Sequence, residues 1–221
     1  GGKKYPEFFN LPTEHGFDLY FATESKVPTC DPMLKPKGRA SGFGWDYLKP
    51  GDATAPYGTH YWSNASSKNA MVKDNLAGDD SRVIMDRAIP FIENAVNADQ
   101  PFLAVIWFHA PHKPCVASPE FYEMYKNEDM ETRNYAGCIS AIDQQVGRLR
   151  AKLDKLGAAE NTMFWFCSDN GPEYGTPGSS GGYLQRKRSL HDGGVRVPGL
   201  LVWPAKVKTG RVEKSPCVTS D

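Results

Sequence analysis

Apolar residues follow two kinds of pattern after residue 79. Continuous runs rich in β-branched and aromatic residues, typical of strands buried on both faces, occupy 101–108, 162–168 and 199–203. Between the first two runs, apolar residues recur at helical spacing over about 129–156. An earlier helical pattern begins at Asp80-Ser81, a pair suited to capping, and Pro90 predicts a kink or a break within it.

The order of strand, long helix and strand predicts a β-α-β unit. We therefore expect an α/β fold whose three strands lie in one largely parallel sheet, with the helix at 129–156 packed on one face. Residues 1–78 are rich in Pro, Gly and aromatic residues and show little periodicity, which predicts ordered, irregular loops with short strands. The chain thus divides into a loop-rich part at 1–78 and an α/β core part at 79–221.

Composition narrows the possible partners. The 221 residues are 40% hydrophobic and 24% charged, with a formal net charge of +0. A nucleic-acid groove or an anionic membrane surface usually requires a basic excess, so we expect no nucleic-acid partner. No apolar run approaches the roughly 20 residues that span a bilayer, so we expect no membrane segment in this chain. The five cysteines form no C-x-x-C pair, which disfavours a zinc knuckle.

The two ends of the chain suggest a piece of a longer protein. The sequence starts at Gly1-Gly2 without a methionine or a signal-peptide pattern, and it stops where a strand or turn begins. We therefore expect an internal fragment whose fold is incomplete at both ends, and its localisation is unknown from the residues alone.

Candidate chemistry follows two of the predicted strands. Asp169-Asn170 comes directly after 162–168, and His109 and His112 follow 101–108. Ligands of open α/β sheets bind beyond the carboxyl ends of the strands, and carboxylate and amide oxygens suit Ca²⁺ or Mg²⁺. Taken alone, Asp-Asn-Gly is more often an Asx turn, with Gly171 at a positive φ.

A third candidate lies in the Gly-rich loop that follows. Lys187 stands between Arg186 and Arg188, and such a cation cluster is usually a solvated loop. His112 alone is as often a hydrogen-bonded structural residue. If Lys187 binds an anion, however, it should point into the crevice while Arg186 and Arg188 point elsewhere.

Taken in order, these segments resemble the type I sulfatases of the alkaline phosphatase superfamily. The resemblance rests on "APHKP" (110–114), "FCSDNGPE" (166–173) and "KRSLHDGGVRVP" (187–198), and it covers nearly the whole chain. It implies an alkaline-phosphatase-like sandwich and a partial sulfatase catalytic domain over 1–221. It also implies that Asp169 and Asn170 ligate the family's calcium. By the same resemblance, Lys187 contacts the substrate sulfate, and His112 touches the sulfate or the leaving oxygen.

The chain departs from the family pattern at its nucleophile. Family members use a formylglycine made from Cys or Ser in C/S-x-P-x-R, whereas the segment that starts with Cys30-Asp31-Pro32 has Leu34 in place of the arginine. We interpret Cys30 as a loop cysteine and expect the formylglycine upstream of Gly1. The fragment alone should then be inactive. The full-length protein should need a formylglycine-generating or anaerobic sulfatase-maturating enzyme.

The resemblance implies a sulfuric ester hydrolase that acts on a sulfated small molecule or polysaccharide, with a carbohydrate sulfate as the first choice. Two alternatives stay open. One is a phosphodiesterase or phosphonate hydrolase of the same superfamily, and the other is a pseudo-sulfatase that binds sulfated glycans without turnover. Family resemblance also implies a periplasmic or secreted protein.

Overall fold

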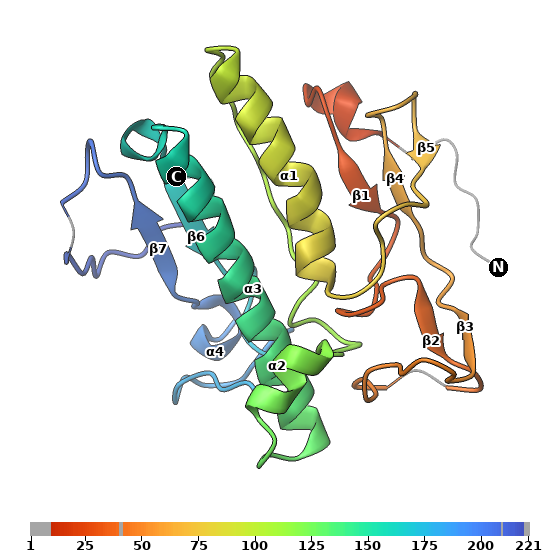
Figure 1. The fold of residues 1–221 in the computed structure, drawn as a ribbon. Coiled ribbons are helices and arrows are strands. Elements are labelled where there is room, and N and C mark those ends of the chain that lie inside the picture. The colour runs from red at the N-terminus through yellow and green to blue at the C-terminus, as the bar shows by residue number, and fades with distance from the viewer. Residues whose placement is uncertain (1–9, 40–41, 209, 219–221) are drawn as a thin grey trace.

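The structure is a computed structural model that describes residues 10–39, 42–208 and 210–218. Two long helices, α1 (Asp80–Asn97) and α3 (Met130–Lys155), pack against each other in the middle of the molecule. Figure 1 shows the hairpin of β6 (Phe164–Cys167) and β7 (Gly199–Val202) on one side of this helix pair. The short strands of the N-terminal part lie on the other side (Figure 1).

Each long helix starts at an aspartate that caps it. The side chain of Asp79 accepts a hydrogen bond from the amide of Arg82, and that of Asp129 accepts one from the amide of Thr132. The helix expected at 129–156 is confirmed. In α1 the expected break at Pro90 is wrong, because the helix runs through this exposed proline with buried residues on both sides of it.

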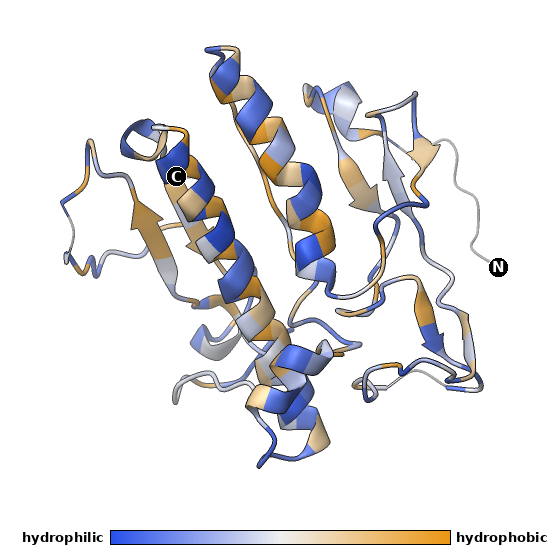
Figure 2. Cartoon of the chain, viewed as in Figure 1, coloured by the Kyte–Doolittle hydropathy of each residue, from blue (hydrophilic) through white to orange (hydrophobic). Residues whose placement is uncertain are grey.

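The main hydrophobic core lies between α1, α3, residues 102–108 and β6. Its buried residues are Met85, Ile89, Ile92, Leu149 and Leu153. Every second residue of the segment 102–108, together with Phe164 of β6, packs against this cluster. Figure 2 shows the hydrophobic residues concentrated on β7 and on parts of α1 and α3. Burial of the core cluster, to which β6 contributes Phe164, holds the helices and β6 together, whereas the apolar residues of β7 are mostly exposed.

The expected pairing of the sheet is wrong in two respects. First, β6 and β7 pair antiparallel, and the loop between them contains the four-residue helix α4 (Asp192–Val195) rather than a long crossover helix. Second, residues 101–108 form no ladder with any strand that the structure describes. One face of this segment is covered, while Leu103 and Trp107 on the other face are 74% and 85% exposed.

The N-terminal part contains the short strands that its sequence predicts. Strands β1 (Phe21–Thr23), β4 (Tyr61–Ser63) and β5 (Ala70–Met71) form an antiparallel sheet, and β2 (Leu34–Pro36) pairs with β3 (Thr54–Pro56). The remaining elements are η2 (Pro12–His15), α2 (Pro119–Met124) and η3 (Ala159–Asn161). Within the described ranges, no helix combines the length and apolar character needed to cross a membrane.

Candidate active site

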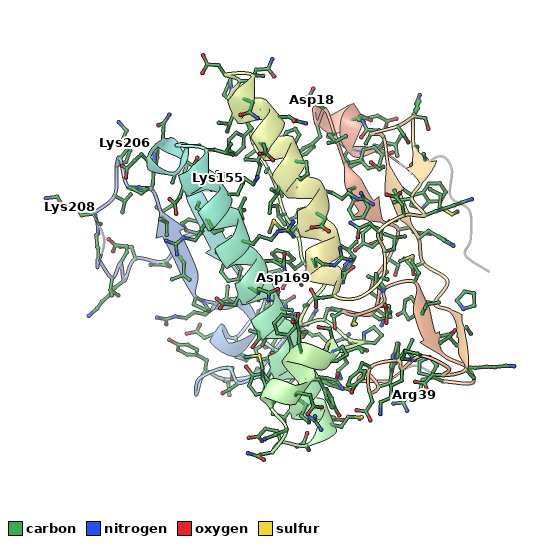
Figure 3. All side chains as sticks on the ribbon, viewed as in Figure 1. Asp18, Arg39, Lys155, Asp169, Lys206 and Lys208 are labelled. Carbon is green, nitrogen blue, oxygen red and sulfur yellow. The ribbon has the colours of Figure 1, made fainter. Side chains whose placement is uncertain are left out.

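A cavity of about 830 Å³ opens where β6 ends. It is lined by residues 108–113, by residues 168–173 and by parts of the loop at 176–198. The four residues that the sequence singles out, Asp169, Asn170, His112 and Lys187, all line this cavity. Asp169 is labelled in Figure 3, close to the middle of the molecule. The fold therefore gathers residues that lie up to 75 positions apart in the sequence around one space.

The end of β6 is held by glycine contacts. The amide of Gly171 donates to the carbonyl of Gly194, and a Cβ on Gly171 would lie 1.9 Å from the carbonyl oxygen of Gly193. Gly171 is not among the residues with positive φ, so the Asx-turn interpretation with a left-handed Gly171 is wrong. Glycine is required here because two stretches of backbone touch, and this contact fixes Asp169-Asn170 against α4.

Asp169 and Asn170 present free oxygen atoms to the cavity. The side-chain amide of Asn170 donates to the carbonyl of Gly171, so its Oδ1 has no bond among the described residues. The carboxylate of Asp169 likewise has no hydrogen bond or ion pair there. Two hard oxygen donors fit part of a Ca²⁺ or Mg²⁺ shell. No cluster of three or more His, Cys, Asp or Glu residues that could hold a metal occurs within the described ranges.

Lys187 is brought back to the cavity by the glycine-rich loop. Its amide donates to the carbonyl of Pro172, and its half-buried side chain lines the cavity without an acidic partner among the described residues. Arg186 turns away and bonds to the carbonyl of Thr176. Arg188, expected to point elsewhere, also lines the cavity, where its guanidinium forms an ion pair with Glu173 at 2.7 Å. The ammonium of Lys187 thus stays available.

His112 stands on a tight turn. Its amide donates to the carbonyl of His109, and its Nδ1 lies 2.7 Å from the carbonyl of Lys113, so Nδ1 carries the proton and Nε2 has no partner among the described residues. Partial burial lowers the pKa of His112, and the nearby charges of Lys187 and Lys26 lower it further. The hydrogen bond to Lys113 and the charge of Asp169 act in the opposite direction. The ring is therefore neutral at pH 7 when no anion is bound.

A buried network supports the turn and was not expected from the sequence. The Nδ1 of His109 lies 2.8 Å from a carboxylate oxygen of Asp80, and its Nε2 lies 3.0 Å from the hydroxyl of Thr23. Tyr61 donates to the other oxygen of Asp80, a residue that is 1% exposed. The position of His109, three residues before His112, is the one signal in the sequence that could have suggested this role.

The cavity also contains residues that the sequence reasoning missed. Lys26 lines it from the loop after β1, and Tyr135 lines it from α3. Lys26 belongs to no recognisable motif, whereas Tyr135 lies in the segment "NYAGCISAIDQQVGRL" (134–149), which resembles the family but indicates no role for this residue. Cys30, in contrast, is 3% exposed and packs with Trp45 and Val116, as expected for a loop cysteine outside the site.

Known proteins with similar sequences are sulfatases. One is an uncharacterised sulfatase of Escherichia coli K12, YdeN, which is 30% identical over 77% of this chain and 30% of its own length. Another is the N-acetylgalactosamine-6-sulfatase of Canis lupus familiaris, which is 28% identical over 94% of this chain and 36% of its own length. The chain thus spans about a third of the length of these relatives.

Solved structures agree with the sequence comparison. The crystal structure of Ps i-CgsB superposes with a TM-score of 0.69 at 25% identity, over 90% of this chain and 42% of that one. Its complex with k-i-k-neocarrahexaose gives a TM-score of 0.58 at 29% identity, over 66% of this chain and 31% of that one. These neighbours confirm the expected α/β fold of the alkaline-phosphatase-like type. The Sulfatase family profile matches residues 8–220, and the chain therefore belongs to the sulfatase family.

Proposed function

We propose that the full-length protein is a sulfuric ester hydrolase that removes sulfate from a sulfated carbohydrate. The observation that supports this most is the gathering of Lys187 and His112 with Asp169-Asn170 around one cavity. The carbohydrate part is supported by relatives, because one is named for a sulfated amino sugar and a structural neighbour holds a neocarrahexaose. The volume of about 830 Å³ is sufficient for a sugar with its substituents.

In this proposal the chain's own residues bind the sulfate and assist the leaving group. The ammonium of Lys187 holds a sulfate oxygen and opposes the negative charge that develops as the bond between sulfur and the sugar oxygen breaks. An anion bound beside His112 raises the pKa of its ring, so Nε2 gains a proton. That proton can then pass to the departing sugar oxygen.

Asp169 and Asn170 would hold the divalent cation, Ca²⁺ or alternatively Mg²⁺, through their free oxygens. The bound cation would supply positive charge next to the sulfate oxygens. Calcium takes six to eight oxygen ligands in general, so two residues cannot complete its shell. We propose that the other ligands come from parts of the protein outside the residues described.

The nucleophile belongs to the same proposal. A formylglycine, made by a formylglycine-generating or an anaerobic sulfatase-maturating enzyme, would supply it from outside this chain, and the chain alone would show no turnover. We further propose that the full-length protein works in the periplasm or is secreted, where large sulfated polysaccharides are found.

The test is a turnover assay of the full-length protein, produced together with a maturation enzyme. We expect release of sulfate from sulfated oligosaccharides and 4-nitrophenyl sulfate, and little release from phosphodiesters. Lys187→Ala should lower kcat roughly 10²–10³-fold, by analogy with the loss of one donor to a developing oxyanion. Lys187→Arg should recover little of this loss, because the planar guanidinium does not occupy the place of an ammonium.

Lys206→Ala is the matched control for this experiment. Lys206 is an exposed lysine that Figure 3 labels near the edge of the molecule, away from Asp169. Near-normal activity of Lys187→Ala would remove Lys187 from the site. Turnover of phosphodiesters instead of sulfate esters would replace the proposed reaction. Tight binding of sulfated glycans without any turnover would indicate a binding protein.

A further inference from the structure

Positive charge exceeds negative charge in the cavity lining, and three of the cations form no ion pair among the described residues. The lining includes Lys26, Lys113, Lys187, Arg188 and Arg196, against the carboxylates of Asp169 and Glu173. Glu173 is engaged by Arg188, and Arg196 approaches Asp192 at 3.6 Å and stacks on the ring of Tyr183. The charged lining groups that remain without an ion pair are the carboxylate of Asp169 and the three lysines.

The three lysines differ in what they touch. Lys113 donates to the carbonyl of Tyr174 and lies 5.8 Å from the centre of the Phe43 ring. Among the described residues, Lys26 and Lys187 have no hydrogen bond or ion pair through their ammonium groups. Ammonium groups that line a cavity attract anions when no ion pair with a protein carboxylate neutralises them.

Lys26 is an exposed lysine, but the backbone that directly follows it is anchored. The residues after it are buried, and both Val27 and Thr29 have 0% exposure. The hydroxyl of Thr29 donates to the carbonyl of Val116 at 2.7 Å and accepts from the amide of Val116 at 2.8 Å. The amide of Thr29 bonds to the carbonyl of Pro114. These bonds tie the loop of Lys26 to the chain that directly follows His112.

The position of Lys26 bears on the charge of the cavity and on the substrates that it can accept. Lys26 comes from the loop after β1, whereas Lys187 comes from the loop after β6, so they approach the cavity from opposite ends of the sequence. The charge of Lys26 is close enough to lower the pKa of His112. A cavity of about 830 Å³ leaves room for a sugar that carries anionic substituents besides the sulfate to be removed.

We propose that Lys26 is a specificity-determining residue that binds a second anionic group of the substrate, either a carboxylate or another sulfate. This inference rests on the proposed function. It adds that the preferred substrate carries at least two negative charges, one at the sulfate to be removed and one next to Lys26. A lysine that only keeps the surface soluble would show no such preference.

The experiment compares Lys26→Gln with the unmodified full-length enzyme on matched sulfated disaccharides. One substrate carries a single sulfate, a second adds a carboxylate, and a third adds another sulfate. We expect Lys26→Gln to raise KM about 10- to 100-fold on the substrate that bears the recognised second anion, because a charge-assisted hydrogen bond is lost. The rise in KM relative to the singly sulfated substrate is the readout, because loss of the Lys26 charge acts on His112 in the same way for all three substrates. The carboxylated and doubly sulfated substrates distinguish the two sources of charge.

Two variants serve as controls. Lys26→Arg keeps the charge and should restore part of the preference. Lys73→Gln changes another exposed lysine of the N-terminal part that does not line the cavity, and it should have no effect. Unchanged kinetics of Lys26→Gln would show a solvated lysine and overturn the proposal. An equal loss on all three substrates would also overturn it, because it would place Lys26 at the scissile sulfate or in folding.

The outcome can be separated from that of the proposed function. If the unmodified enzyme turns over none of the three disaccharides, the proposed hydrolase function fails. The same disaccharides are then titrated by calorimetry against the unmodified protein and Lys26→Gln. A preference for doubly charged disaccharides that disappears in Lys26→Gln would support the role of Lys26. Equal affinities would refute it.

Discussion

At the scale of single residues, the charge state of His112 depends on its neighbours in the cavity. Burial and the charges of Lys187 and Lys26 lower its pKa, and these influences outweigh the raising effects of Asp169 and the Lys113 carbonyl. An unperturbed histidine titrates near 6.5, so the ring of the free protein loses its proton below that pH. The Nε2 atom of His112 is thus a hydrogen-bond acceptor at neutral pH until an anion enters the cavity.

The pH dependence expected of the full-length enzyme follows from the lowered pKa of His112. If His112 donates a proton to the leaving oxygen, kcat/KM should fall as pH rises through the lowered pKa, so the alkaline limb should begin below about pH 6.5. The measurement is a pH profile of kcat/KM on a sulfated sugar. In His112→Asn the remaining activity should be low and should lack this limb. A limb that persists unchanged in His112→Asn would assign the titration to another group.

Some residues of the candidate site can be predicted from the sequence, and others cannot. Asp169, Asn170, Lys187 and His112 belong to short motifs rich in glycine or proline, so the sequence alone places them together by family resemblance. Lys26 has no motif, because its place in the cavity depends on Thr29 bonding to a residue 87 positions away. Long-range bonds of this kind leave no local pattern in the chain.

At the scale of elements, the contact between the end of β6 and α4 fixes the candidate site. Gly193 and Gly194 are as crowded as Gly171, since a Cβ on them would lie 2.0 Å and 2.1 Å from the carbonyl oxygens of Gln185 and Ser189. The glycines of the Asp-Asn-Gly and Asp-Gly-Gly motifs therefore serve packing. Each brings backbone close enough that the loop of Lys187 can close over the end of the strand.

Gly171→Ala tests this contact. The added methyl group would overlap the backbone of Gly193, so the two segments must move apart, at a cost of about 1–3 kcal/mol. Thermal or urea unfolding measures the change. The control is Gly147→Ala, at an exposed position inside α3 where a Cβ meets nothing within 4 Å. That variant should be neutral or more stable by up to about 1 kcal/mol, because alanine favours helix. Equal stability of both variants would contradict the packing role.

Helices were easier to predict than sheet pairing, for a physical reason. The bonds of α3 are local, so periodicity and the cap at Asp129 suffice to locate it. Whether β6 and β7 run parallel depends on the path of the thirty-odd residues between them. The pattern of apolar residues does not determine that path. An apolar run also cannot distinguish one covered face from two, which is why residues 101–108 were expected to be buried on both sides.

At the scale of the whole molecule, hydrophobic surface remains exposed where residues 101–108 lie. The helices cover one face of this segment, and Leu103, Val105 and Trp107 point away from them with exposures of 74%, 49% and 85%. The segment has no strand partner within the described ranges. An extended segment with an apolar face and unpaired backbone groups is prone to pair with another chain.

The 221-residue chain produced by itself should therefore self-associate and bind a hydrophobic dye. Light scattering across a concentration series and the fluorescence of 8-anilinonaphthalene-1-sulfonate measure these two properties. The double variant Leu103→Lys with Trp107→Lys should reduce both, because charges on an exposed edge oppose pairing between chains. Leu190→Lys is the matched control, since Leu190 is 95% exposed on the loop before α4 and stands outside this surface. A chain that stays monomeric without dye binding, or an equal effect of Leu190→Lys, would show that the exposed face of 101–108 does not govern association.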